Sequence, residues 1–147
     1  MRIGIASDHG GFELKQHIYS FLRKAGHELT DFGNAKEDSG DDYPDFVIPL
    51  ARAVVERKIE RAVAICGSGV GASICANKVK GARAALIHDH FSAHQGVEDD
   101  DMNILCMGGR IIGPMLAEEI VTAFLAARFS GAERHSRRLN KVKALEK

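Results

Sequence analysis

The stretch RAVAICGSGVGASICANK, residues 61–78, decides the fold, because an apolar run ends at Cys66 and leads through three alternating glycines into a helical pattern. The apolar run is typical of a buried strand. The glycines allow a tight turn and a close approach of the backbone to another group. The helix that follows presents free N–H groups, which favour an anion. The stretch therefore predicts a strand, an anion-binding loop and a helix; the alternative is a tight turn without a ligand.

The same alternation of strand and helix patterns runs along the chain. Strands are predicted at 2–7, 28–33, 61–66, 82–87 and 103–109, and helices at 11–26, 44–57, 70–78, 114–128 and in the basic tail. Strands that alternate with helices form a parallel sheet with right-handed crossovers and covered faces. We therefore expect a single α/β domain over residues 1–147: a Rossmann-like, three-layer α/β/α sandwich with a five-stranded parallel sheet and a C-terminal helical tail over about 132–147.

Composition excludes several classes of protein. The 147 residues carry 20 basic and 20 acidic side chains, so the net charge is zero and gives no reason to expect binding to nucleic acid or to a membrane surface. The apolar run IGIA near the start is too short for a signal peptide or a membrane span, which predicts a soluble, cytoplasmic protein. The three cysteines lack CxxC spacing, so we expect neither disulfides nor structural zinc.

Chemistry-bearing residues follow four of the predicted strands. They are Asp8 with His9, the run 66–69, the run 88–90, and Gly108 to Arg110. In parallel α/β sheets, ligands bind outside the carboxyl ends of the strands. A thiol, carboxylates, imidazoles and a guanidinium thus converge on one edge, which predicts the binding site there.

Cys66 is the candidate nucleophile or base. It ends a strand just before a helix, where the helix dipole and nearby donors favour the thiolate form. The alternative is a buried apolar cysteine, which is our interpretation of Cys75 and Cys106.

Two further groups have both a functional and a structural interpretation. Asp8 beside His9 can orient a sugar hydroxyl or transfer a proton, or Asp8 can simply cap the next helix. Arg134 and Arg138 are four residues apart and share a helix face suited to a phosphate, whereas Arg137 points elsewhere. The alternative for the arginines is a solvated basic tail.

Two rival sites are weaker. Gly67-x-Gly69-x-x-Ala72 fits the dinucleotide pattern with Asp89 as the ribose-binding acid, but the motif lies in the third strand–helix unit and no second domain remains. Residues 87–101 are rich in histidines and acids, yet their spacing matches no defined set of metal ligands. We expect this segment to be a mobile, acidic active-site loop.

Five motifs in order resemble the ribose-5-phosphate isomerase B family, which includes the galactose-6-phosphate isomerase subunits. They are ASDHGGFELK at 6–15, YPDF at 43–46, CGSGVGASICANK at 66–78, NILCMGGRIIG at 103–113, and the paired arginines. The resemblance covers nearly the whole chain. It implies an α/β/α sandwich, homodimers or homotetramers with active sites shared across the dimer interface, a phosphorylated sugar as substrate, and no cofactor or metal.

The resemblance also implies roles for individual residues. Cys66 matches the catalytic base, which moves a proton between C1 and C2 of the open-chain sugar, and Ala72 stands where other members carry a glutamate base. Ser68 matches a residue that assists at the sugar oxygens. The remaining matches contact the substrate, its enediolate or its phosphate: Asp8, His9, Tyr43, Gly67, Gly69, Val70, Gly71, Arg110, Arg134 and Arg138.

One departure from the family affects ring opening. The family carries His-Asn-Asp where this chain has Asp99-Asp100-Asp101. Asp99 can act as the ring-opening acid if neighbouring acids keep it protonated, with Asp100 binding substrate; otherwise His94 reaches the site, or the substrate needs no ring opening, as with erythrose 4-phosphate. We expect an aldose–ketose isomerase of the ribose 5-phosphate type that works through a cis-enediolate. The alternatives are an isomerase of another sugar phosphate and a non-catalytic sugar-phosphate binder.

Overall fold

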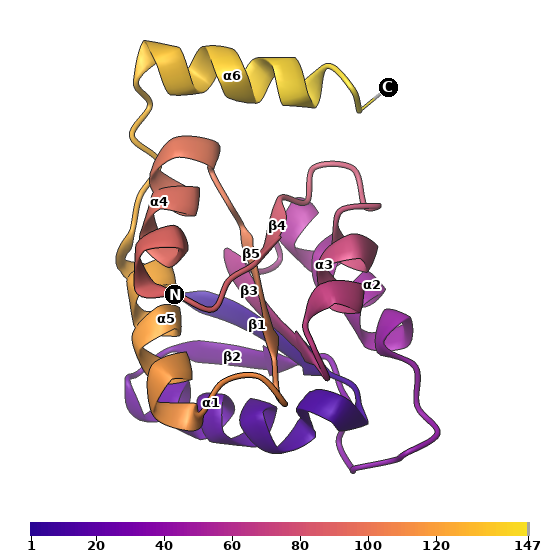
Figure 1. Cartoon of the computed structure of the whole chain (residues 1–147). Helices are drawn as coiled ribbons and strands as arrows, with labels where there is room; N and C mark the ends of the chain where they lie inside the picture. Colours follow the sequence, from indigo (N-terminus) through magenta and orange to yellow (C-terminus); the bar gives the residue numbers. More distant parts are fainter. Residues whose placement is uncertain (147) are drawn as a thin grey trace.

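Five parallel strands form one sheet in the order β2-β1-β3-β5-β4 (Figure 1). The structure is a computed structural model and describes residues 1–146. The strands are β1 (Arg2–Ser7), β2 (Glu28–Asp31), β3 (Arg61–Cys66), β4 (Ala84–Leu86) and β5 (Ile104–Gly108). All five predicted strands are confirmed, although β4 is shorter than expected.

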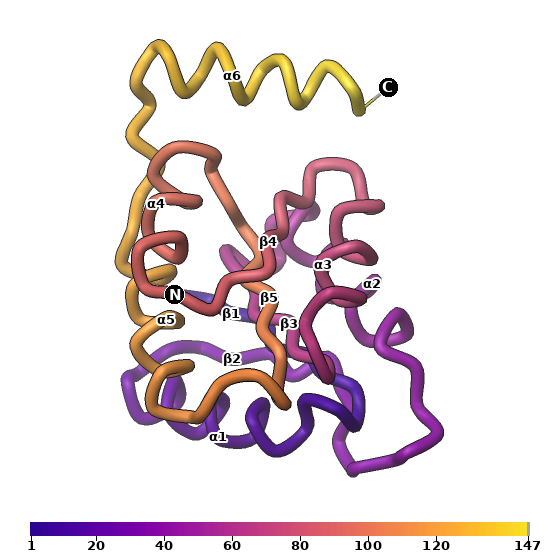
Figure 2. The backbone as a smooth tube through the Cα atoms, in the orientation of Figure 1, coloured from indigo at the N-terminus to yellow at the C-terminus, as the bar shows by residue number. Residues whose placement is uncertain are grey.

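Helices cover both faces of the sheet, so the predicted three-layer α/β/α sandwich is confirmed. They are a short 3₁₀ turn η1 (His9–Gly11), α1 (Phe12–Lys24), α2 (Tyr43–Val55), α3 (Val70–Ala76), α4 (His90–Asp100), α5 (Pro114–Ala126) and α6 (Glu133–Lys143). Buried residues of α1, α4 and α5 form one hydrophobic cluster with the sheet, and those of α2 and α3 form the other. The tube in Figure 2 shows the chain passing repeatedly between these layers.

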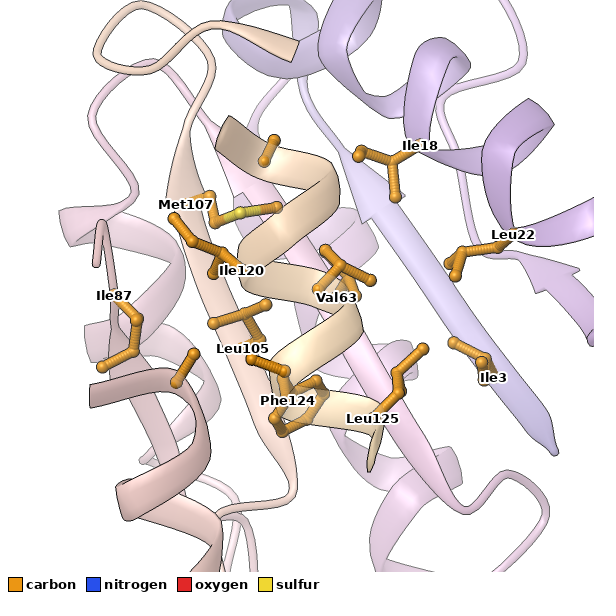
Figure 3. Close-up of a cluster of buried hydrophobic side chains, with 14 of the residues drawn as sticks. Ile3, Ile18, Leu22, Val63, Ile87, Leu105, Met107, Ile120, Phe124 and Leu125 are labelled. Carbon is orange, nitrogen blue, oxygen red and sulfur yellow. The ribbon is translucent and has the colours of Figure 1, made fainter. Parts of the chain in front are cut away.

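The alternation of side chains along the strands assigns each residue to one layer. In β3, Val63 and Ile65 face α1 and α5, whereas Ala64 and Cys66 face α2 and α3. Figure 3 shows the first of these faces, where Val63 lies near large apolar side chains of the surrounding strands and helices. Cys66 therefore ends its strand on the side of the sheet that α3 covers.

Residues His90–Asp100 form helix α4, so the prediction of a loop over 87–101 was wrong for most of that segment. The Asp89 side chain caps α4 by accepting a hydrogen bond from the Ser92 N–H at 2.7 Å. Ala93 and Val97 are fully buried one turn apart. The many polar residues obscured this pattern in the sequence, because only one narrow stripe of α4 faces the core.

The last helix, α6, lies beyond the amino ends of β4 and β5, away from the carboxyl ends of the strands (Figure 1). Its contact with the rest of the molecule is narrow, since His135 and Leu139 are its buried residues. No helix within residues 1–146 has the length and apolar character that crossing a membrane requires.

Candidate active site

A cavity of about 410 Å³ opens at the carboxyl ends of β1, β3 and β5. Its lining combines the strand ends with the start of α2 and of α3: Asp8, Tyr43, Cys66, Gly67, Ser68, Gly71, Arg110 and Ile111. The predicted convergence of chemistry-bearing residues at this edge of the sheet is thus confirmed for three strands. Residue His88, after β4, lies at the same edge, because its Nε2 accepts a hydrogen bond from the Gly108 N–H at 2.9 Å.

Cys66 is held at the bottom of the glycine loop. The Gly69 N–H donates a hydrogen bond to its Sγ at 3.2 Å, and the residue is 5% exposed. This geometry requires glycine at 69, where φ is +81° and a Cβ would lie 2.7 Å from the Met107 carbonyl carbon. The loop therefore supplies a backbone donor to the sulfur.

Ser68 of the glycine loop and Tyr43 at the start of α2 also line the cavity. Ser68 is exposed, and its Oγ accepts a hydrogen bond from the Val70 N–H at 3.3 Å. The Tyr43 ring packs so closely on Gly71 that a Cβ there would lie 2.7 Å from the ring. The first turn of α3 therefore lies at the cavity between the Ser68 hydroxyl and the Tyr43 ring.

Arg110 is positioned by the backbone that follows β5. Its N–H donates to the Gly67 carbonyl at 3.0 Å, and the Gly109 N–H donates to the Cys66 carbonyl at 2.8 Å. Nη1 of Arg110 lies 3.5 Å from where a Cβ of Gly67 would be. The exposed guanidinium of Arg110 therefore lies over the glycine loop.

Asp8 has the structural role that the sequence left open. Its Oδ1 accepts a hydrogen bond from the Gly10 N–H at 2.9 Å and so caps η1. Burial raises the pKa of Asp8, while the neighbouring His9 opposes that rise. Asp8 still lines the cavity, so capping does not remove it from contact with a ligand.

His9 pairs with a residue that the sequence analysis missed. Its Nδ1 lies 2.7 Å from Oδ1 of Asp41. This hydrogen bond raises the pKa of His9. Asp41 belongs to a polar loop with several acids, and no spacing signal marks it, since only the tertiary structure brings it to β1.

The remaining predicted residues lie at the opposite end of the sheet. Helix α4 runs back against the strands, so Asp99 and Asp100 lie near the amino end of β5, beside α6 with Arg134 and Arg138 (Figure 1). Asp101 confirms this position, because its Oδ2 lies 2.6 Å from Nη2 of Arg83 just before β4. Within one protomer, Cys66 and these four residues therefore lie at opposite ends of the sheet.

His135 organises this second group. Its Nδ1 lies 3.2 Å from Oδ1 of Asp99 and 2.8 Å from Oγ of Ser130. Its Nε2 accepts a hydrogen bond from Nε of Arg134 at 2.9 Å. The other Asp99 oxygen accepts a hydrogen bond from Nε2 of Gln95 at 2.6 Å. Both oxygens of Asp99 are therefore engaged within the protomer.

Arg137 differs from the other arginines of α6, as the helical spacing predicted. Arg137 forms an i,i+4 pair with Glu133 at 2.9 Å. Arg138 is exposed and has no acidic partner within residues 1–146. Arg138 is therefore free to bind an anion from outside the protomer.

A second cavity, of about 550 Å³, lies beside this group. It is bounded by α3, β4, α4 and α6 and lined by Asn77, Ala82, Arg83, Ala84, Ala85, Gly96, Asp100, Met102, Leu139, Val142, Leu145 and Glu146. Most of this lining is apolar, with Asp100 at its edge.

Neither a metal site nor a dinucleotide site gains support from the geometry. Donor atoms of Asp8, His9 and Asp41 lie within 4.8 Å of one another, but His9 and Asp41 already pair and Asp8 caps a turn. Asp89, the acid of the dinucleotide interpretation, is used as the cap of α4. His94, the alternative acid for ring opening, lies 3.1 Å from Glu98 on the same helix.

Comparison with known proteins finds relatives that match nearly the whole chain. Residues 3–142 match the family described as Ribose/Galactose Isomerase. The structure of Clostridium thermocellum ribose-5-phosphate isomerase B is 45% identical, with a TM-score of 0.95 over 99% of this chain and 97% of that one. Ribose-5-phosphate isomerase B of Mycoplasma genitalium, solved with bound ribulose-5-phosphate, is 38% identical, with a TM-score of 0.94 over 99% and 95% of the two chains. D-erythrulose-4-phosphate isomerase of Pectobacterium atrosepticum is 37% identical over 89% of this chain and 86% of its own.

Proposed function

This chain belongs to the ribose/galactose isomerase family, and from that premise we propose that it interconverts an aldose phosphate and its ketose, as in ribose 5-phosphate and ribulose 5-phosphate, with Cys66 as the base. The observation that carries the proposal is the Cys66 sulfur at the glycine-loop cavity, with a backbone N–H donating to it at 3.2 Å. A cysteine at the end of a strand, next to the start of a helix and to a backbone donor, is suited to removing a proton from carbon.

The reaction proceeds through a cis-enediolate. The Cys66 thiolate removes the C2 proton of the open-chain aldose, and the electron pair moves onto the carbonyl oxygen. Backbone N–H groups at the start of α3 stabilise that oxyanion, a contribution of about 3 kcal/mol per donor in other enzymes. Ser68 moves the proton between the two oxygens, and Cys66 returns its proton to C1, which yields the ketose. No cofactor enters these steps.

A second copy of the chain completes the site. His9 and Arg110 lie at the carboxyl end of the sheet, whereas Arg134, Arg138, Asp99 and Asp100 lie at the amino end. In a two-fold dimer, each carboxyl-end cavity meets the amino end of the other copy, so that Arg134 and Arg138 hold the phosphate together with His9. The split between the two groups supports a homodimer, or a homotetramer built from such dimers.

The carboxylates at 99 and 100 favour a second candidate substrate. They replace the family's ring-opening histidine and its asparagine, and both oxygens of Asp99 are engaged by neighbouring side chains. A tetrose 4-phosphate cannot close a furanose ring, because the oxygen that would close it carries the phosphate, and so it needs no ring opening. One relative is named a D-erythrulose-4-phosphate isomerase. Complete loss of catalysis, with retained sugar-phosphate binding, is the third alternative.

Proton NMR in D₂O with ribose 5-phosphate, allose 6-phosphate and erythrose 4-phosphate tests these alternatives together. We expect the C2 proton signal of one aldose to disappear as its ketose appears. Preference for erythrose 4-phosphate would favour the tetrose alternative. Binding of a sugar phosphate without any exchange of the C2 proton would contradict the proposal of an active isomerase.

A further inference from the structure

Asp41 is the buried partner of His9. It belongs to the polar loop between β2 and α2, and its Oδ1 accepts two hydrogen bonds from His9: one from the backbone N–H at 2.9 Å and one involving Nδ1 at 2.7 Å. The Asp41 side chain is 5% exposed, whereas that of His9 is 32% exposed. One carboxylate oxygen therefore fixes both the backbone and the ring of His9, and the ring still reaches solvent.

A further residue holds Asp41 in place. Nδ2 of Asn34 donates a hydrogen bond to its Oδ2 at 3.2 Å. Burial by itself raises the pKa of Asp41, but the hydrogen bonds from His9 and Asn34 outweigh that effect and lower the pKa below its ordinary value. Asp41 is thus an ionised, oriented carboxylate, and both of its oxygens have donors.

Three charged groups face the His9 ring: Asp41, Asp8 and Arg110. The hydrogen bond with Asp41 raises the pKa of His9, desolvation opposes it, Asp8 adds a further increase, and Arg110 lowers it. Since Nδ1 is engaged by Asp41, Nε2 is the ring nitrogen left to bind a ligand, and it has no hydrogen-bond partner within residues 1–146.

We propose that Asp41 is a positioning residue of the phosphate site, which holds the His9 ring with Nε2–H directed at the substrate phosphate and stabilises the protonated ring. The inference rests on the proposed function, which assigns His9 to the phosphate. A hydrogen bond between an ionised donor and an ionised acceptor is about twice as strong as a neutral one. Asp41 does not touch the substrate and acts only through His9.

The pH dependence follows from the sign of the shift. Because the pKa of His9 is raised, its contribution to phosphate binding is complete below the ordinary histidine value and is lost as the pH rises through the raised value. Without the Asp41 charge, this loss begins at lower pH. The difference in phosphate binding between the protein with and without the Asp41 charge is clearest above about pH 7, where the phosphate is already a dianion.

The kinetic test compares Asp41→Asn with Asp38→Asn, a change in the same loop at a residue whose Oδ1 caps Gly40. With the sugar phosphate that the enzyme turns over, Asp41→Asn raises KM about tenfold near neutral pH and changes kcat less than about threefold. Asp38→Asn leaves both constants unchanged. In a His9→Asn background, Asp41→Asn adds nothing; a further tenfold rise there would overturn the inference.

A second measurement needs no activity. Long-range ¹H–¹⁵N NMR follows the His9 ring as the pH is varied, with and without inorganic phosphate. We expect phosphate to shift the Nε2 resonance and raise the His9 pKa, and Asp41→Asn to lower that pKa. An unchanged His9 titration in Asp41→Asn, or no response to phosphate, would overturn the inference. Loss of the proposed isomerase activity would be a separate result, because inorganic phosphate binding would still test Asp41.

Discussion

At the scale of single residues, the three cysteines differ in what surrounds each sulfur. Cys66 has a backbone donor and lines the carboxyl-end cavity. Burial raises the pKa of Cys75 and, much more, that of Cys106. These raised pKa values, and the absence of both residues from the lining of the carboxyl-end cavity, support the interpretation of Cys75 and Cys106 as unreactive thiols.

Replacing Cys66 by alanine tests its role as the base. We expect kcat to fall by about 10²–10⁴-fold, the usual contribution of a general base, while KM stays nearly unchanged. Steady-state rates and C2 proton exchange in D₂O measure the change. Cys75→Ala is the matched control and retains its kcat. Turnover close to normal in Cys66→Ala would remove Cys66 from the role of base.

Single-residue predictions succeeded where the sequence position itself carries the information. The glycine loop and the residues after each strand could be predicted because strand ends converge at one edge of a parallel sheet. Asp41 could not, because its contact with His9 joins residues 32 positions apart through a loop with no periodic pattern. The roles of the other site residues, such as Ser68 and Tyr43, stay predictions.

At the scale of elements, a buried lysine joins α1 to the edge strand β2. Lys15 is 0% exposed, and its Nζ lies 2.9 Å from both carboxylate oxygens of Asp31. It also donates to the Asn34 carbonyl at 2.6 Å. The Asp31 side chain is 31% exposed, so the two ends of this ion pair differ in their access to water.

This difference predicts which partner is harder to remove. Asp31→Asn leaves a buried ammonium without its counter-charge and destabilises the fold by about 2–3 kcal/mol. Lys15→Met leaves a carboxylate that water can reach, and costs about 1 kcal/mol or less. Urea unfolding at one fixed protein concentration measures both, with the exposed Lys24→Met as control. A larger loss of stability in Lys15→Met than in Asp31→Asn would contradict this account.

The helices and strands were predictable wherever the spacing of apolar residues in the sequence matches the face that is buried in the structure. The five strands and the amphipathic α1 follow their patterns, and their ends shift by a few residues. Helix α4 was missed because its buried stripe is narrow and its many acids and histidines suggest a solvated loop, although an i,i+4 pair such as His94 with Glu98 is typical of a helix. Packing against the sheet and α5 determined this helix, not local propensity.

At the scale of the whole molecule, the residues that the family resemblance assigns to a shared site lie in two groups at opposite ends of the protomer, and the proposed dimer makes each group one half of a site. The sulfur of Cys66 belongs to the carboxyl end of the sheet, and Arg134 with Arg138 belongs to α6 at the amino end. A linear sequence cannot show this separation, since it depends on the direction in which α4 and α6 run past the sheet.

Mixing two inactive variants tests whether the halves meet between copies. Cys66→Ala abolishes one half-site, and the Arg134→Ala/Arg138→Ala double variant abolishes the other. When equal amounts are unfolded and refolded together, half of the dimers are hybrids, and each hybrid pairs the two intact halves in one of its two sites. We expect recovery of about a quarter of the wild-type kcat/KM. Sites built within one protomer would give none, because every chain carries a defect, and each variant refolded alone provides the baseline.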